Sequence, residues 1–214
     1  QAVSRGLGDV YKRQLLGQAY FQLGSDKKSE SEKLDYYEKA LESMLSAVKT
    51  AEIEEYKPKE NWYVLMAACY SELQSRIGKE ESLYKQLDIY EILVNLYPKK
   101  MYFIQLGGIY GQLNRELDYM ITLNAAYQKD LLDKESEYLA LTQLLLLNNN
   151  PYWAAKVLEA GRVKKVPIID EKTKEEKIVP VVKDNEKNLK LLADAWRMAQ
   201  DCLLYTSPSP RDTA

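Results

Sequence analysis

The chain has 214 residues, of which 46% are hydrophobic, and its 30 basic and 32 acidic side chains give a formal net charge of −2. This mildly acidic composition argues against nucleic-acid binding, which needs a basic face to contact phosphates, and the longest apolar run, Leu144 to Leu147, is too short to cross a bilayer. The chain contains no histidine and therefore lacks the commonest general base and metal ligand, so we expect neither an enzyme nor a bound cofactor or metal.

The two ends of the chain read as translated DNA rather than as protein. Residues 4–14, SRGLGDVYKRQ, and residues 202–212, CLLYTSPSPRD, can be encoded by opposite strands of one DNA element. That element is similar to the transposase adapter used to build sequencing libraries. We therefore expect residues 1–14 and 202–214 to be adapter sequence, and the protein between them to be a fragment. Cys69 is then the one genuine cysteine, so no internal disulfide is expected.

A repeated apolar pattern predicts three helix pairs. Segments 15–23, 65–73 and 105–113 each place a large apolar residue before a small one, a tyrosine three positions later, and a leucine three further on. This is the spacing of one helix face, with the small residue where a neighbouring helix comes close. A second amphipathic helix is predicted after each segment, at 36–51, 87–98 and 119–132.

Two polar stretches, 25–33 and 74–82, separate the helices of the first and second pairs. Because loop closure costs little more as a loop grows, we expect these insertions to lengthen helices or loops without changing how the pairs stack. A fourth, less regular pair is predicted at 136–147 and 152–161. Pro151 is suited to the first turn of its second helix and Gly161 to its C-terminal cap.

The helical pattern then stops and resumes. Residues 163–183 contain two β-branched runs around a charged turn, each interrupted by a proline, which predicts a short exposed hairpin or ordered loop near 163–182. Helical spacing returns over 184–201, which is interpreted as the first helix of a further repeat.

These patterns resemble the tetratricopeptide repeat (TPR), in which Leu-Gly and Tyr in a first helix are followed by Ala, an aromatic residue, Ala and a closing Pro in the second. The resemblance implies an all-α, TPR-type α-solenoid, a right-handed superhelix of about four antiparallel helix pairs over residues 15–162. It also implies that the aromatic rings of the pattern pack between helices and do not form a cage for a peptide. The signature positions are Leu16, Gly17, Tyr20, Ala40, Ala47, Ala67, Tyr70, Tyr90, Pro98, Leu106, Gly107, Tyr110, Ala126 and Trp196.

In such a solenoid the partner lies in a concave groove that is lined mainly by the first helices. TPR chaperone adaptors clamp a C-terminal carboxylate with Lys and Asn on successive first helices. Here Val64 and Ile104 stand at the lysine positions, and Ala68 and Gly108 at the asparagine positions. An extended apolar peptide or a partner helix therefore fits better than a carboxylate. The candidate groove residues are Gln18, Phe21, Asn61, Val64, Ser71, Ile104, Gln105, Gly108, Gln112, Lys190 and Arg197.

Longer strings carry a closer resemblance. Residues 57–73, 94–113, 151–161 and 185–196 are similar to the exported TPR protein that accompanies TonB–ExbB–ExbD energy-transduction systems in Gram-negative bacteria. The resemblance implies a periplasmic, non-catalytic adaptor of a TonB-dependent transport system, with components of that system as candidate partners.

Two other functions are compatible with the same residues. One is a generic cytoplasmic TPR adaptor or assembly chaperone, and the other is a regulatory module fused to an enzyme beyond residue 201. A signal peptide upstream in the complete gene and neighbouring TonB-type genes would favour the periplasmic adaptor. A reading frame that starts without an apolar leader would favour the cytoplasmic one.

Overall fold

A computed structural model describes the backbone of residues 2–169, 174 and 176–206, with side chains described between residues 8 and 200 of these ranges. Over this part of the chain the regular structure consists of helices α1 to α10 and one two-stranded sheet. The predicted all-α class with a small hairpin is therefore confirmed. The chain divides into two compact units, Gln1–Asn114 (unit 1) and Arg115–Ala214 (unit 2).

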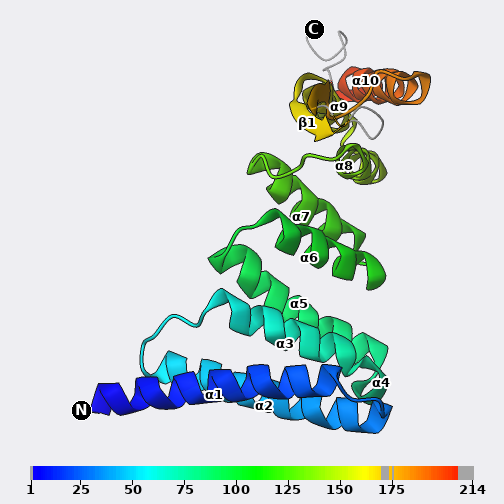
Figure 1. Cartoon of the computed structure of the whole chain (residues 1–214). Coiled ribbons are helices and arrows are strands. Elements are labelled where there is room, and N and C mark those ends of the chain that lie inside the picture. Colours follow the sequence, from blue (N-terminus) through cyan, green and yellow to red (C-terminus); the bar gives the residue numbers. More distant parts are fainter. Residues whose placement is uncertain (1, 170–173, 175, 207–214) are drawn as a thin grey trace, which may run out of the picture. The chain divides into compact units, whose positions relative to one another are not determined.

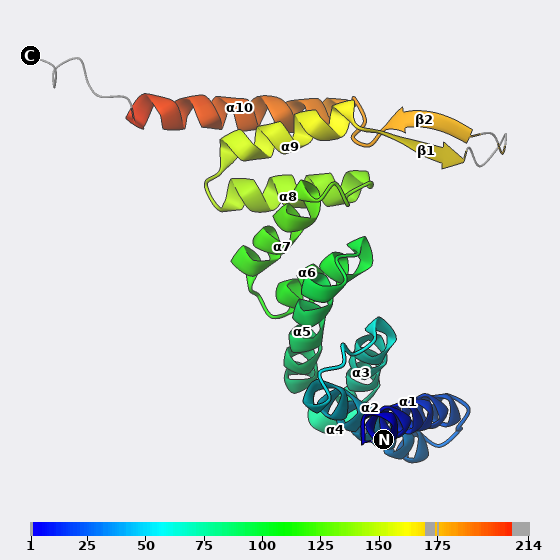
Figure 2. The ribbon, with the colours of Figure 1, turned by 90° about the vertical axis from the view of Figure 1, so that its left-hand side faces the viewer.

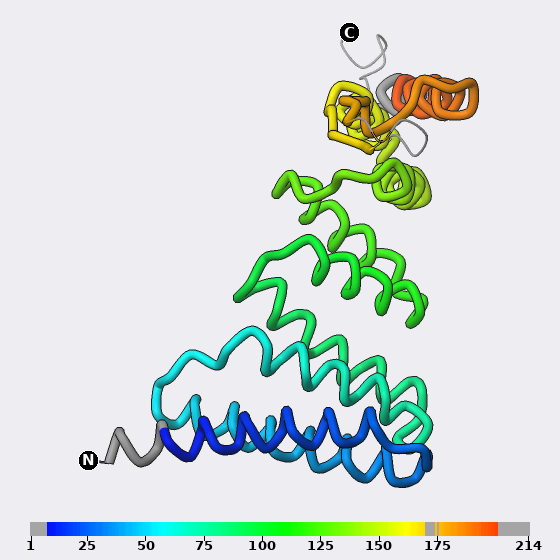
Figure 3. The backbone as a smooth tube through the Cα atoms, viewed as in Figure 1, coloured from blue at the N-terminus to red at the C-terminus, as the bar shows by residue number. Residues whose placement is uncertain are grey.

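Unit 1 is a succession of helices that reverse direction after each turn, as the backbone trace in Figure 3 shows. The α1 helix packs against α2, α2 against α3, α3 against α5, and α5 against α6 (Figure 1). The elements are α1 (Ala2–Ser25), α2 (Glu30–Ile53), α3 (Glu60–Glu72), α4 (Gln74–Ile77), α5 (Lys79–Leu96) and α6 (Lys100–Gln112).

The core of unit 1 lies among α2, α3 and α5. Met44 of α2, Trp62 of α3 and Leu93 of α5 are each at most 1% exposed. A Cβ atom on Gly17 would lie 2.6 Å from Sδ of Met44, so the missing side chain is what allows α1 to approach α2 this closely. The small residue of the repeated pattern thus stands at a close helix–helix contact in α1.

Unit 2 also packs its helices in sequence order, α7 against α8, α8 against α9, and α9 against α10. Figure 2 shows α10 lying along α9, with the hairpin extending from the end of α9 that leads into it. The elements are α7 (Glu116–Gln128), α8 (Glu135–Leu147), α9 (Pro151–Val163), β1 (Lys165–Ile169), β2 (Glu176–Pro180) and α10 (Glu186–Thr206).

The hairpin contains one proline in each strand, Pro167 in β1 and Pro180 in β2. At its base the Val181 N–H donates to the Lys164 carbonyl at 2.9 Å. Because bonded and non-bonded pairs alternate in an antiparallel ladder, both prolines fall in non-bonded pairs, where the main-chain nitrogen points out of the hairpin. The missing N–H therefore costs no ladder bond.

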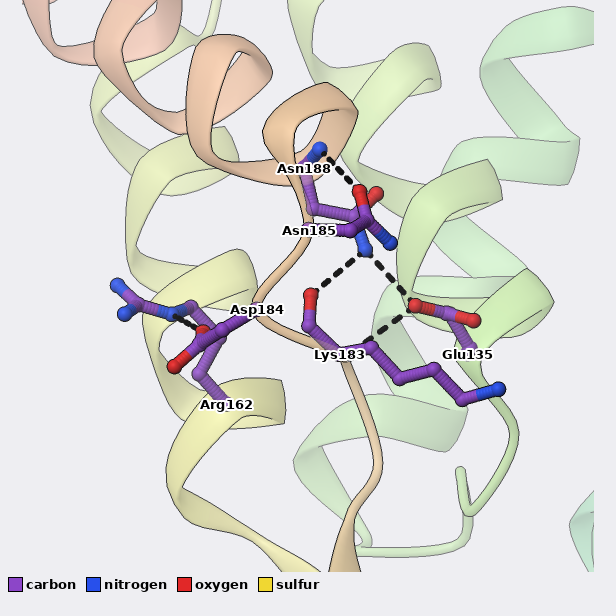
Figure 4. Close-up of polar contacts among 6 residues, drawn as sticks. All are labelled: Glu135, Arg162, Lys183, Asp184, Asn185 and Asn188. Atoms are coloured by element: carbon purple, nitrogen blue, oxygen red, sulfur yellow. Dashed lines mark hydrogen bonds and ion pairs between the residues drawn. The ribbon is translucent and has the colours of Figure 1, made fainter.

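A polar network joins the chain after the hairpin to α8 (Figure 4). The Glu135 carboxylate at the start of α8 accepts hydrogen bonds from the Lys183 N–H at 3.0 Å and from Asn188 Nδ2 at 2.8 Å. Asn188 Nδ2 also donates to the Lys183 carbonyl, and Asn185 Oδ1 accepts the Asn188 N–H at 2.9 Å, which caps α10. Arg162 of α9 pairs with Asp184 beside this network.

The predicted helices are all present, and several details differ. Both polar insertions are mainly helical, because α2 already begins at Glu30 and the second insertion forms α4 and the first turn of α5. Pro151 is the first residue of α9, as predicted. The α7 helix ends at Gln128 instead of Leu132, since Asp130 takes a left-handed conformation with φ of 57°.

The prediction that Gly161 caps α9 is wrong. The helix continues through Gly161 to Val163, and Lys164 is the cap residue. The glycine is needed for space, because a Cβ atom at this position would lie 2.5 Å from Cγ2 of Val182 and 2.7 Å from Cδ1 of Tyr138.

The TPR signature positions differ in burial. Leu16 is 46% exposed because α1 turns the adjacent Gly17 toward α2, and consecutive residues lie about 100° apart around a helix. Four of the five signature rings, Tyr20, Tyr70, Tyr110 and Trp196, are expected to pack between helices; Tyr110 is buried and the other three keep part of their surface in solvent. Buried positions are Gly17, Ala40, Ala47, Ala67, Leu106, Gly107, Tyr110 and Ala126; Tyr20, Tyr70, Tyr90 and Trp196 are partly exposed, and Leu16 and Pro98 are exposed.

No helix in the described part of the chain has both the length and the apolar character needed to cross a membrane.

Candidate functional site

The structure leaves every candidate groove residue at least partly accessible to solvent. Phe21 and Ile104 are partly exposed, and Gln18, Asn61, Val64, Ser71, Gln105, Gly108, Gln112, Lys190 and Arg197 are exposed. All but Lys190 and Arg197 belong to unit 1. Of these nine, Gln18 and Phe21 lie on α1 and the other seven on α3 and α6, which form the candidate site.

A pocket of about 490 Å³ lies between the N-terminal ends of α3 and α6. Asn61 and Val64, two of the candidate residues, line it, and Val64 is 36% exposed. The remaining lining residues are Lys59, Glu60, Lys99 and Tyr102. Sequence reasoning missed these four residues.

Glu60, the first residue of α3, forms the polar part of this pocket. Its carboxylate accepts hydrogen bonds from Lys99 Nζ at 2.7 Å and from the Tyr102 hydroxyl. The bond from Lys99, followed by that from Tyr102, holds the pKa of Glu60 below its ordinary value of 4.5. Burial and then the bond to Glu60 raise the pKa of Tyr102 to about 12. At neutral pH the carboxylate is thus ionised and the phenol is protonated.

Two similar turns place these side chains. The turn before α3 contains Pro58 and the turn before α6 contains Pro98, and each is followed directly by a lysine. The proline constrains the residue before it, so Tyr97 leaves the helical conformation and α5 ends. The Tyr97 hydroxyl then donates to the Pro58 carbonyl at 2.8 Å, which joins the two turns.

Lysines stand at the N-terminal end of α6. The first turn of α6 has no acidic residue, and Lys99 and Lys100 stand at its N-terminus, where the helix dipole disfavours cations. Within the described residues, the Lys59 ammonium group makes no hydrogen bond or ion pair, while that of Lys99 is paired with Glu60. The pocket therefore combines an apolar wall with a free ammonium group, a paired one and an amide.

Other candidate residues continue from this pocket or lie away from it. Gln105 and Gly108 are three residues apart on α6, so they are neighbours on its exposed surface. Nothing lies within 4 Å of a Cβ built on Gly108, which leaves open space there. We call Asn61, Val64, Gln105 and Gly108 the first-helix face.

Gln112 and Phe21 are not part of this face. Gln112 lines a separate pocket with Lys79 and Tyr84 at the start of α5. The Phe21 ring packs 5.2 Å from the Tyr37 ring, so this residue joins α1 to α2. Its position four residues after Gly17 explains the inward direction, because i and i+4 share one helix face.

In unit 2, Lys190 and Arg197 are exposed on α10, and Arg197 pairs with Asp194 at 3.2 Å. Trp196 packs against Tyr152 with ring centroids 5.7 Å apart, and its indole N–H donates to Glu159 at 3.0 Å. This ring therefore holds α10 against α9.

Cys69 is fully buried, and burial raises the pKa of its thiol to about 12, so it is protonated at neutral pH. In the part of the chain that the structure describes, no three His, Cys, Asp or Glu side chains lie together in a way that could hold a metal ion. The chemistry that the pocket between α3 and α6 offers is non-covalent recognition by ammonium groups, an amide and an apolar wall.

Comparison with known proteins finds no matching family model, no similar curated protein and no similar solved structure.

Proposed function

We propose that this chain is a non-catalytic scaffold that binds another protein through the first-helix face of unit 1. The observation that carries the proposal is the pocket between α3 and α6, which exposes Val64 among ammonium and amide groups. A mixed apolar and polar surface on successive helices is the kind of surface that receives an extended peptide or a partner helix.

The sequence resemblance supports a more specific form of this proposal, a periplasmic TPR adaptor of a TonB-dependent energy-transduction system. A cytoplasmic TPR adaptor or assembly chaperone is the alternative. The complete gene separates the two, because a signal peptide and adjacent TonB-type genes are expected for the first and neither for the second.

The binding face can be tested with two matched positions. Val64 of α3 and Ile92 of α5 are aliphatic residues with similar exposed fractions, 36% and 38%. A photo-cross-linking residue at position 64 should capture a partner, with components of the TonB system as the first candidates. The same residue at position 92 should not.

The captured partner then allows a quantitative test. Val64→Arg should weaken its binding by about tenfold or more, as truncating a central interface residue does, while Ile92→Arg should bind like the parent chain. Circular dichroism checks that both variants stay helical. Equal capture from both positions, or unchanged binding by Val64→Arg, would contradict the proposal.

A further inference from the structure

We propose that the pocket between α3 and α6 binds a peptide segment in which a carboxylate side chain stands next to an aliphatic one. This inference rests on the proposed function and adds the chemistry of the partner. It is carried by the pairing of the charges in the pocket and by the apolar wall beside them.

The apolar part of the pocket can receive an aliphatic side chain. Val64 is 36% exposed, while the Tyr102 ring beside it is only 3% exposed and held by its bond to Glu60. An aliphatic group placed against Val64 would remove apolar surface from water without moving the Tyr102 ring.

The charges leave one cation without a partner. The Glu60 carboxylate is already bonded to Lys99 and Tyr102, whereas Lys59 on the same pocket has no ion pair within the described residues. Lys99 remains 57% exposed on its outer side. A carboxylate between Lys59 and Lys99, within reach of the Asn61 amide, would complete the pairing.

The two lysines are also placed where a helix does not favour them. Lys59 and Lys99 are the N-cap residues of α3 and α6, and neither caps its helix with a side-chain hydrogen bond. Positive charge at a helix N-terminus opposes the helix dipole. A carboxylate from a partner would relieve this repulsion at both helices together.

The same pocket discriminates against polyanions such as nucleic acids. Glu60 contributes a negative charge at the pocket, and the chain as a whole is acidic. One carboxylate can pair with Lys59 and avoid Glu60, but a phosphodiester chain would bring several charges close to it. The geometry therefore favours a short acidic and aliphatic peptide.

The experiment uses the full chain and a labelled Gly/Ser-rich peptide with one central Glu-Leu-Glu segment. Matched peptides carry Gln-Leu-Gln or Lys-Leu-Lys. The Glu peptide should bind at least about fivefold more tightly than the Gln peptide at low salt, because one or two exposed ion pairs are lost, and the difference should shrink at high salt. The Val64 methyl and Asn61 amide NMR signals should shift on binding.

Charge reversal locates the site. Lys59→Glu should weaken the binding of the Glu peptide by about fivefold or more, and it should favour the binding of the Lys peptide. Lys49→Glu is the control, since Lys49 is likewise an exposed lysine and lies on α2. This variant should bind the Glu peptide as tightly as the parent chain does. Equal binding of the Glu and Gln peptides, or equal effects of the two reversals, would overturn the inference. If either result is obtained while Val64→Arg still abolishes binding of the protein partner, the proposed function stands and only the preference for a carboxylate next to an aliphatic side chain is rejected.

Discussion

The Gly161 carbonyl of α9 accepts a hydrogen bond from the Val182 N–H at 2.9 Å, and Cγ2 of Val182 fills the place where a Gly161 Cβ would stand. The chain leaving the hairpin therefore returns against the bare backbone of α9. The opposite wall is the Tyr138 ring of α8, which is 2% exposed.

Gly161→Ala should destabilise unit 2 by about 1–3 kcal/mol, the usual cost of overpacking, although alanine is the better helix former. Val182 and Tyr138 are both buried and stiff, so they cannot move aside cheaply. Gly108→Ala is the matched control. Its Cβ meets open space in a helix, so it should stabilise by about 0.4–1 kcal/mol. Denaturant unfolding followed by circular dichroism measures both, and a neutral Gly161→Ala would refute the close contact.

Asn188→Asp should destabilise the chain by about 2–3 kcal/mol at neutral pH, because a carboxylate oxygen would replace the amide that donates to Glu135 at 2.8 Å. Asn188 is 3% exposed, so water cannot compensate. The loss should diminish at acidic pH, where one carboxylate of the pair is protonated. Asn185→Asp is the matched control, since it also replaces an amide by a carboxylate, but at a side chain that accepts the Asn188 N–H. Its stability should be unchanged or slightly raised. Similar losses for the two variants would contradict the assigned contacts.

The low pKa of Glu60 makes unit 1 sensitive to acid. A carboxyl group whose pKa is lower in the folded state stabilises that state above its unfolded pKa, near 4.5, and this contribution is lost as the pH falls through the folded pKa. Lys99→Met should raise the pKa of Glu60 more than Tyr102→Phe does, because the bond from Lys99 is the larger cause. A carboxyl-carbon NMR titration of Glu60 in the three proteins gives the order, and the reverse order would disprove the assignment.

Buried tyrosines should make the fold sensitive to alkali. Burial raises the pKa of Tyr138 to about 12, against an ordinary value of 10.0. Such a group stabilises the folded state fully below pH 10, and the contribution is lost as the pH rises through about 12, at up to about 1.4 kcal/mol per pH unit. The midpoint of unfolding should therefore fall less between mildly and strongly alkaline pH in Tyr138→Phe than in the parent chain. An identical fall would show that Tyr138 is not the group responsible.

The helices could be predicted from sequence because their apolar spacing is strong, and Pro151 gave the start of α9 for a local reason. The function of Gly161 could not be predicted, since it depends on Val182, which comes back to α9 only after the hairpin. Phe21 was expected to face the open groove. Its ring instead packs against Tyr37 of α2, because the close contact of Gly17 with Met44 fixes which side of α1 faces α2.

The pocket between α3 and α6 was missed for a similar reason. Lys59 and Lys99 are separated by a whole repeat, and their convergence depends on how α3 and α6 pack through α5. One signal was present in the sequence, the proline followed by lysine before each of these two helices. A search for features repeated outside the apolar pattern would have found it.

The outward-pointing nitrogens of Pro167 and Pro180 have a consequence for assembly. A further strand added to either edge of the β1–β2 hairpin would lack one N–H donor, at Pro167 or at Pro180. Growth of the hairpin into a larger sheet is therefore disfavoured. Ile169 and Ile178, 71% and 73% exposed, remain open to contact. These two side chains therefore offer a partner more of the hairpin's surface than its interrupted edges do.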